Sequence, residues 1–402
     1  MNTNTTTTRN TLLLLHIVVV LACAACGATE PEPDNNVLDG SVAGLSSAQQ
    51  RLHNLGDAAF NDEVFTKATG LGPAFVASSC GSCHPGDGRG HPSTALIRFG
   101  QSKPGENEWL GRGGPQLQQH AVPGFDAEML PPGTASSVFL APIATGLGFL
   151  DAVTDATLLE YADEFDSDND GISGRPNRVA IAPYVSLRRN ASVENGLAIG
   201  RFGRKASAYN LHQQTAVAYN QDIGITSELE PVDAYTNLRS DPEVSLATIN
   251  NVVFYLQTLR VPPRRDQNNP DVMHGEQLFT AIGCATCHRA SMTTGSADIT
   301  ALANKTIHPY SDLLLHDMGT ELDDGYTEHQ ATSAEWRTTP LWGLGLSMQS
   351  QGGQLFLLHD GRARSIEAAI QSHGGEGAKA RSAFFALPAH EQRLVVRFLE
   401  SL

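Results

Sequence analysis

Two short stretches of the sequence place two cysteines and a histidine at the spacing Cys-x-x-Cys-His. On a helix, thiols at positions i and i+3 lie side by side and can form thioethers with the two vinyl groups of a haem, while the histidine at i+4 can bind its iron. Zinc ribbons and thioredoxin-like redox sites also use Cys-x-x-Cys, but two complete copies in one chain favour two covalently bound haem c groups. The residues of the two copies are Cys80, Cys83, His84, Cys284, Cys287 and His288.

A second ligand for the second haem is indicated by a short amphipathic segment near the C-terminus. Ser365 can cap a helix on which Ile366, Ala369 and Ile370 form an apolar stripe, and His373 continues that stripe at i+7. A lone histidine on an apolar face is more often a core residue than a ligand. Because a haem iron with one free position is expected in the same half of the chain, we predict that His373 binds it.

A tight loop precedes this helix. Gly361 provides an unusual backbone conformation there, and Arg362 is available for a haem propionate, although an ordinary capped turn explains the loop equally well. The corresponding segment of the first half is expected at residues 201–206. Counting the same distance onward from its glycine reaches Thr215 and Ala216, neither of which can bind iron.

The two haems are therefore predicted to differ. Haem two is expected to be six-coordinate through His288 and His373 and suited to electron transfer, whereas haem one keeps an open position that can bind peroxide or oxygen. The alternative is that His91 or His120 fills the open position at rest.

A third candidate site has alternate carboxylates before a turn-forming glycine, at Asp166, Asp168 and Asp170. Oxygen ligands at this spacing are typical of calcium loops. Position twelve of the loop is Asn177 instead of a bidentate glutamate, so the segment is not an EF-hand. An acidic, solvated turn is the alternative interpretation.

Length and charge restrict the function further. A chain of 402 residues with 41% hydrophobic residues is long enough for two domains. The formal net charge of -16 argues against nucleic acid as a partner. It leaves a small basic redox protein as electron donor, or a neutral small substrate, as possible partners.

The N-terminal residues 1–26 read as a lipoprotein-type export signal, with an apolar run too short to span a bilayer followed by small residues before a cysteine. Lipidation is expected at Cys26; Cys23 is the rival position, and a plain export signal is the third interpretation. The mature protein is expected in the periplasm or cell envelope, attached to the membrane by this lipid anchor. Residues 27–45 are expected to form a flexible tether, because they hold too few apolar residues to fold.

The chain contains an internal duplication. Residues 252–259 match residues 395–402 with helical periodicity, and each segment closes one half. A proline-rich stretch, 260–270, separates the halves. We therefore predict a mainly α fold with long loops and two cytochrome c-like haem domains, at residues 46–260 and 261–402.

Beyond the haem motifs, several segments resemble the bacterial di-haem oxidoreductase family, a branch of the di-haem cytochrome c peroxidase superfamily whose members are often labelled thiol oxidoreductases. The matching segments are Gly70–Phe75, Ser79–Gly90, Asp170–Asn177, Gln214, Asp222–Thr226, His308–Gly319, Glu335–Thr338, Pro340–Gly343, Leu358–Ala363 and His373–Glu376. The resemblance implies that His373 is the sixth ligand of haem two, that calcium binds between the domains, and that Gln214 and Asp222 lie over the reactive haem. It also implies an aromatic electron relay where this chain has Arg204, which leaves Trp336 and Trp342 as alternatives.

These observations predict an exported di-haem c-type oxidoreductase. Electrons would enter at haem two from a small redox protein, and peroxide or another small oxidant would react at haem one. A plain di-haem electron carrier and a haem-dependent oxygenase are the alternatives. A thiol oxidoreductase is not supported, because no cysteine remains outside the leader and the two motifs.

Overall fold

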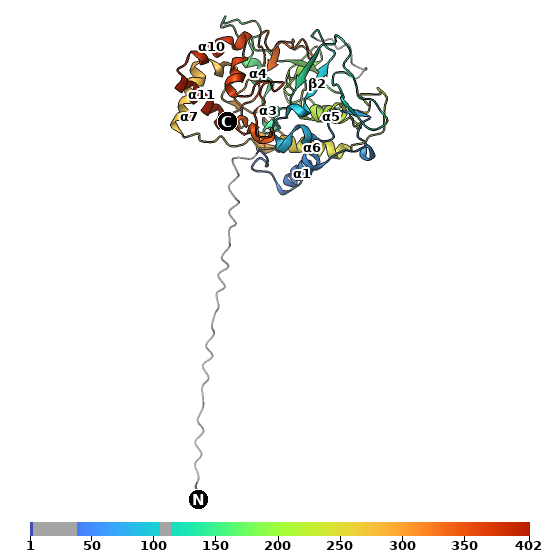
Figure 1. Cartoon of the computed structure of the whole chain (residues 1–402). Helices are drawn as coiled ribbons and strands as arrows, with labels where there is room; N and C mark the ends of the chain where they lie inside the picture. The colour runs from blue at the N-terminus through green and yellow to red at the C-terminus, as the bar shows by residue number, and fades with distance from the viewer. Residues whose placement is uncertain (3–37, 105–113) are drawn as a thin grey trace. The chain divides into compact units, whose positions relative to one another are not determined.

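The computed structural model describes residues 1–2, 38–104 and 114–402 (Figure 1). The described residues from 38 to 402 lie within one compact unit. The helices of the described part are α1 (Ser47–Asp57), α2 (Cys80–Cys83), α3 (Leu147–Ala152), α4 (Asp155–Tyr161), α5 (Leu211–Gln221), α6 (Leu246–Thr258), α7 (Pro270–Ala281), α8 (Ser347–Ser350), α9 (Ile366–Gln371), α10 (Ala378–Ala386) and α11 (Ala389–Ser401).

Short antiparallel strands connect these helices. The strands are β1 (Ala74–Phe75), β2 (Leu96–Phe99), β3 (His120–Ala121), β4 (Ser136–Phe139), β5 (Arg178–Ala180), β6 (Val193–Glu194), β7 (Leu197–Ile199), β8 (Met292–Thr293), β9 (Thr306–Ile307), β10 (Leu315–Asp317) and β11 (Glu335–Arg337). Most pair two by two, as β1-β3, β2-β4, β8-β9 and β10-β11, and β5-β7-β6 form a three-stranded sheet. Helix makes up 34% and strand 13%, so the predicted helices are present but a mainly α fold is not confirmed.

Each half of the chain contains a long helix pair, and each pair packs closely at a glycine. α1 packs on α6, and α7 packs on α11 (Figure 1). A Cβ atom on Gly56 of α1 would lie 2.1 Å from the carbonyl oxygen of Asn251, and one on Gly275 of α7 would lie 2.0 Å from that of Leu394. Only glycine lets the helix backbones approach this closely. The predicted duplication therefore has a structural counterpart in these two crossings.

A second pair of glycines, one in each half, also lies close to the backbone of the closing helices. A Cβ atom on Gly148 would lie 1.9 Å from the carbonyl oxygen of Gln257 in α6, and one on Gly345 would lie 1.9 Å from that of Glu400 in α11. Each carbonyl lies six residues after the one that meets the first glycine of its half. Both closing helices are thus held at two equivalent points.

The largest apolar clusters follow these helix pairs. One is built mainly from the first half and includes Leu211 and Tyr219 of α5 and Val252 and Leu256 of α6. Another is built from the second half around Phe279 of α7, with residues of α9, α10 and α11. The boundary that we predict between residues 260 and 261 lies within the compact unit and stays a prediction.

The first described residues after the N-terminal region do not behave as a tether. Leu38 and Val42 are buried, and Ser41 forms a β-bridge with Leu259 just after α6. The prediction of a tether over residues 27–45 is therefore wrong for residues 38–45, because their few apolar side chains find a place in the core. The predicted signal 1–26, with Cys23 and Cys26, and the rest of the tether lie outside the described residues, apart from the first two. Among the described helices, none has the length and apolar character needed to span a membrane.

Candidate functional site

The first Cys-x-x-Cys-His motif forms the short helix α2, whose N-terminus is capped by Ser79 Oγ accepting from Ser82 N. Burial raises the pKa of both thiols, Cys80 and Cys83, to about 12. Zinc binding and thiol redox chemistry require a thiolate of lowered pKa. The surroundings of these cysteines therefore favour neutral thiols over a zinc site or a thiolate redox site.

The histidine of this motif lies in an apolar environment. The ring of Phe60 lies 5.6 Å from that of His84, and burial lowers the pKa of His84 to about 4. The imidazole thus stays neutral, as a metal ligand must. Its Nδ1 atom makes no hydrogen bond of normal geometry, although the backbone of Pro142 and Gly88 lies beside it.

In the second half, two histidines share one hydrogen-bonding arrangement. His288 Nδ1 lies 2.9 Å from the carbonyl oxygen of Tyr310, and His373 Nδ1 lies 2.8 Å from that of Ala369. A carbonyl can only accept, so both Nδ1 atoms carry the proton and both Nε2 atoms are free to bind a metal. The two rings lie close enough that the charge of His373 acts on the pKa of His288. These two histidines would hold one haem iron.

The structure confirms the helix predicted before His373, with a small difference at its end. Ser365 Oγ accepts from Ala368 N and caps α9. The helix ends at Gln371, two residues earlier than expected, so His373 lies just after its last turn. The hydrogen bond to Ala369 keeps the histidine one turn above that residue.

The loops that precede α5 and α9 have the same backbone design. In the first half, Phe202 and Ala208 form an isolated β-bridge; in the second half, Leu357 and Ala363 form the other. The two partners of each bridge are six positions apart in the sequence. The two loops are therefore equivalent elements of the duplicated halves.

Their backbone conformations fix the register between the halves. One residue after the start of each bridge, Gly203 and Leu358 have positive φ angles of 83° and 70°. Four residues after the start, Ala206 and Gly361 have positive φ angles of 52° and 81°. Ala206 is thus the counterpart of Gly361, and Gly203 is not. Counting from the glycine gave a register that is wrong by three residues, because an alanine holds the left-handed position in the first half.

The corrected register identifies the counterpart of His373. Asn210 caps α5 as Ser365 caps α9, each eight residues after the start of its bridge. His373 lies eight residues after its cap, and the same step from Asn210 reaches Ala218. The methyl side chain of an alanine cannot bind iron. The prediction that Thr215 or Ala216 is the equivalent position is wrong, but the conclusion that no ligand stands there is unchanged.

Gln214 and Asp222 lie one helical turn before and after Ala218, so all three share one face of α5. Burial raises the pKa of Asp222 to about 6, against the charge of Arg98, and the charge of Asp222 acts on the thiols of the first motif. Asp222 is therefore near the first haem site. Gln214 is half-buried in the first half of the same helix.

The alternative ligands lie on other elements. Nδ1 of His91 accepts from Ser93 N, and its ring packs against Phe356 at 4.7 Å. His120 is exposed on β3, with its ring 5.8 Å from that of Phe75. Neither belongs to α5.

Arg362 does not have the environment expected for a propionate ligand. Its Nε donates to Asp360 Oδ2 at 2.7 Å, its Nη1 donates to the carbonyl of Glu321, and 45% of its side chain is exposed. Arg204 is buried instead and donates from Nε and Nη2 to the carbonyl of Leu140. The structure thus favours the ordinary capped turn at Arg362.

Trp336 lies in a buried stack. The centroid of its ring lies 3.7 Å from that of the His359 ring, and the two rings are nearly parallel. Lys205 Nζ lies 3.8 Å from the centroid of the Trp336 ring. Trp342 is also buried, and its ring would meet a Cβ atom on Gly146 at 2.7 Å. Both tryptophans therefore pack in the interior.

The sequence profile of the family described as "Di-haem oxidoreductase, putative peroxidase" matches residues 140–402, which is more than half of the chain. The chain belongs to this family. Membership implies haem as the cofactor and an oxidoreductase as the general class of protein. The paired histidines of the second half and the buried motif of the first are the parts of this di-haem oxidoreductase that fit two haems.

Solved structures add distant likenesses. A hydrazine synthase of Kuenenia stuttgartiensis is 14% identical, with a TM-score of 0.40, and the match covers 98% of this chain and 100% of that one. A MauG-like protein associated with microbial copper homeostasis is 16% identical, with a TM-score of 0.32, over 53% of this chain and 79% of that one. Both likenesses are too low to carry an argument. No curated protein matches the sequence.

Beside the second motif of the di-haem oxidoreductase lies a charged histidine that sequence reasoning did not single out. His316 Nε2 contacts Asp312 Oδ2 at 2.9 Å, and its Nδ1 contacts Glu376 Oε2 at 2.6 Å. Burial opposes its protonation, but the bonds to Asp312, Cys287 and Glu376 outweigh burial and raise its pKa to about 12. Asp312 and His316 lie in one of the segments that resemble the family and Glu376 lies in another, but nothing in the sequence indicated that these two segments meet.

A second missed group lies against the end of α5. Gln118 is fully buried and donates from Nε2 to the carbonyls of Asn220 and Gln221, next to Asp222. Glu128 accepts from Gln118 N at 2.7 Å, and burial raises the pKa of this carboxyl to about 7. Long loops bring these residues to the helix, so no local pattern could predict them.

The acidic loop places its carboxylates differently from the prediction. Asp166 and Asp168 lie close to Asp163, with oxygen atoms of all three within 4.8 Å of one another. Asp170 Oδ1 instead accepts from Ile172 N. Asp170 is therefore not part of this group, and Asp163, which the prediction omitted, replaces it.

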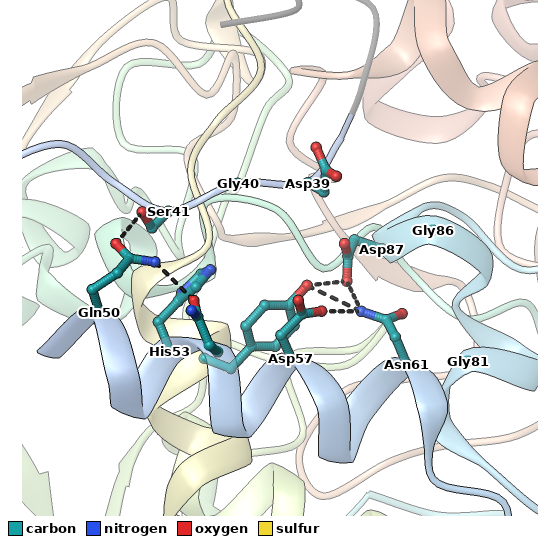
Figure 2. A pocket seen from close by; sticks show the side chains of 12 residues that line it. Asp39, Gly40, Ser41, Gln50, His53, Asp57, Asn61, Gly81, Gly86 and Asp87 are labelled. Atoms are coloured by element: carbon teal, nitrogen blue, oxygen red, sulfur yellow. Dashed lines mark hydrogen bonds between the residues drawn. The ribbon is translucent and has the colours of Figure 1, made fainter. Parts of the chain in front are cut away.

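A pocket of about 680 Å³ borders the first haem motif at Gly81 and is lined mainly by residues of α1 and of the segment that follows α2 (Figure 2). Asp87 is buried at its wall, where Oδ1 accepts from Tyr255 at 2.7 Å and from Asn61 at 3.3 Å. Burial raises the pKa of Asp87 to about 6. Asp57 lines the same pocket and also accepts from Asn61.

Proposed function

We propose that this di-haem oxidoreductase is an exported peroxidase-like enzyme with two covalently bound haem c groups. His288 and His373 would hold haem two, where electrons would enter, and His84 would hold haem one, where peroxide would be reduced. The observation that carries the proposal is the corrected register between the halves, in which Ala218 stands where the second half has His373. One half therefore offers two imidazoles and the other offers one.

Haem c, once bound, supplies two irons that each carry one electron and, at an open position, bind peroxide. The protein supplies attachment, axial ligands and proton transfer. Asp222 is suited to proton transfer because its pKa of about 6 allows it both to hold and to release a proton near neutral pH. Gln214, one turn before Ala218 on the same face of α5, could donate a hydrogen bond to a bound small molecule.

The remaining parts of the proposal rest on the sequence. The proposal of covalent attachment is supported by the two Cys-x-x-Cys-His motifs. Export, with lipidation at Cys26, follows from the N-terminal pattern. Calcium is proposed at Asp166 and Asp168 together with Asp163. A small electron-donor protein and a small oxidant are the proposed partners.

The resting spectrum tests the proposal against a plain electron carrier. We expect an EPR spectrum with one high-spin ferric signal from haem one and one low-spin signal from haem two. Two low-spin signals would favour the carrier, and a colourless product made alongside a working cytochrome maturation apparatus would end the proposal.

Two substitutions test the register itself. Ala218→His should convert haem one to a low-spin, six-coordinate form and abolish peroxide reduction, because it installs the missing imidazole. His373→Gly should convert haem two to high spin and leave the signal of haem one in place. Val217→His, at a half-buried position one residue away on another face of α5, is the matched control and should leave both signals unchanged. An unchanged spectrum in Ala218→His would overturn the assignment of the open position.

A further inference from the structure

Three buried arginines lie together in the interior. Arg89 follows the first haem motif, Arg204 lies in the loop before α5, and Arg337 ends β11; they are 5%, 6% and 7% exposed. Burial lowers the pKa of Arg204 to about 9 and the pKa values of Arg89 and Arg337 to about 10. The charge of Arg89 lowers the pKa of the other two further, so the cations repel one another.

Within the described residues, none of these guanidinium groups forms an ion pair with a carboxylate. The hydrogen bonds that they donate go to the backbone carbonyls of Pro340, Leu140, Gly203 and Thr338. Nε of Arg89 is buried without any partner. The carboxylates whose charges act on the cluster, Asp360 and Asp312, are engaged by Arg362 and His316.

Another buried arginine of the same chain forms an ion pair with a carboxylate, as buried arginines usually do. Arg201 is fully buried, and its Nη2 forms an ion pair with Asp155. Removing a charge from water costs several kcal/mol unless an opposite charge is near. Three neighbouring cations that lack such a partner therefore indicate that anions other than the chain's own carboxylates belong there.

The position of the cluster indicates which anions these are. The charge of Arg204 acts on the pKa of His84, so the cluster borders the first haem site. Arg337 N donates to the carbonyl of Arg204 at 3.1 Å, and Asp312 acts on both Arg337 and His288. The cluster therefore borders the first haem site, and Asp312 links its Arg337 to the surroundings of His288.

We propose that Arg89, Arg204 and Arg337 form a shared clamp for haem propionates, with Arg204 holding a propionate of haem one. The clamp rests on the proposed function, because it requires haem in both halves. Guanidinium groups bind carboxylates strongly and with fixed geometry. The clamp keeps the propionates ionised and joins the two haem sites through the backbone bond between Arg204 and Arg337.

The test compares the haem-loaded protein with the variants Arg204→Gln and Arg204→Lys. Resonance Raman spectroscopy reports the propionate bending bands, and spectroelectrochemistry reports the reduction potential of each haem. We expect Arg204→Gln to shift the propionate bands and to lower the potential of haem one, because a positive charge that favours the ferrous state is lost. Arg204→Lys should retain most of the potential but not the bands, since an ammonium cannot reproduce the planar contact.

The matched control is Arg362→Gln, which removes the exposed arginine of the equivalent loop and should leave both the bands and the potentials unchanged. A folded Arg204→Gln protein with two haems and unshifted propionate bands would overturn the clamp, whatever its potential. If band shifts occur instead in Arg362→Gln, the propionate ligand lies there. Failure of the proposed function is distinguishable, because it shows in the resting EPR spectrum of the unmodified protein.

Discussion

Asp87 shows how a single buried carboxyl group makes stability depend on pH. Its folded-state pKa of about 6 lies above the usual value of 3.8, mainly because of burial. The neutral carboxyl is therefore favoured in the folded protein. Its contribution to the free energy of unfolding is fully present below pH about 4 and is lost as the pH rises through about 6.

We expect Asp87→Asn to remove this loss of stability at rising pH. Asparagine keeps an oxygen that can accept from Tyr255 and Asn61 but cannot ionise. The free energy of unfolding of the haem-loaded variant, measured with denaturant, should fall by about 2 kcal/mol less than that of the wild type between pH 4 and pH 7. Asp57→Asn is the control, because its exposed carboxylate lines the same pocket (Figure 2). Parallel stability curves for wild type and Asp87→Asn would contradict the prediction.

Residue types indicated the candidate iron ligands more directly than they indicated the register between the two halves. The motif histidines and His373 stand out by spacing alone, and both His288 and His373 have the free Nε2 that this role requires. Ala218 could not be found from the sequence, because an alanine carries no signal of its own. Its register depends on Ala206, which adopts a conformation that sequence reasoning assigns to glycine.

At the scale of elements, helices with a strong apolar period were predictable and the strands were not. α6 and α11 cover the two segments matched in the sequence, with bounds that differ by a few residues. Strands of two to four residues are too short to display alternation between two faces. The arginine cluster was equally hidden, because its members come from three separate elements.

Replacing Gly275 at the crossing of α7 and α11 by alanine is expected to destabilise the protein, which is the opposite of the usual effect in a helix. In an exposed helix, Gly→Ala stabilises by up to about 1 kcal/mol. Here the new methyl would lie 2.0 Å from the carbonyl of Leu394 and 2.9 Å from Cβ of Phe398, so α7 and α11 must separate. We expect Gly275→Ala to destabilise the protein by about 1–3 kcal/mol, measured by denaturant unfolding.

Met273→Ala provides the control on the same helix, because that side chain is 49% exposed and should cost little. Gly56→Ala should behave like Gly275→Ala, since its methyl would lie 2.1 Å from the carbonyl of Asn251. A higher melting temperature for either glycine variant would show that the two crossings are not tight, and the structural duplication would lose its support.

At the scale of the whole molecule, the net charge bears on how the proposed electron donor would approach. Lysine and arginine number 27 against 43 aspartate and glutamate residues, which gives the net charge of -16. Such an excess attracts a basic redox protein over long distances and accelerates its association by about 10- to 1000-fold at low salt. The attraction weakens as salt shortens the Debye length from about 30 Å at 0.01 M to about 3 Å at 1 M.

We therefore expect the second-order rate constant for reduction of the ferric protein by a small basic cytochrome c to fall at least about tenfold between 0.01 M and 1 M salt. Stopped-flow absorbance of the haem bands measures it. A neutral hydroquinone is the matched reductant and should show almost no salt dependence, because it carries no charge to steer. If the rate with the basic protein is the same at both salt concentrations, the acidic surface does not guide the donor. A donor of neutral or acidic character would then replace the basic partner in the proposed function.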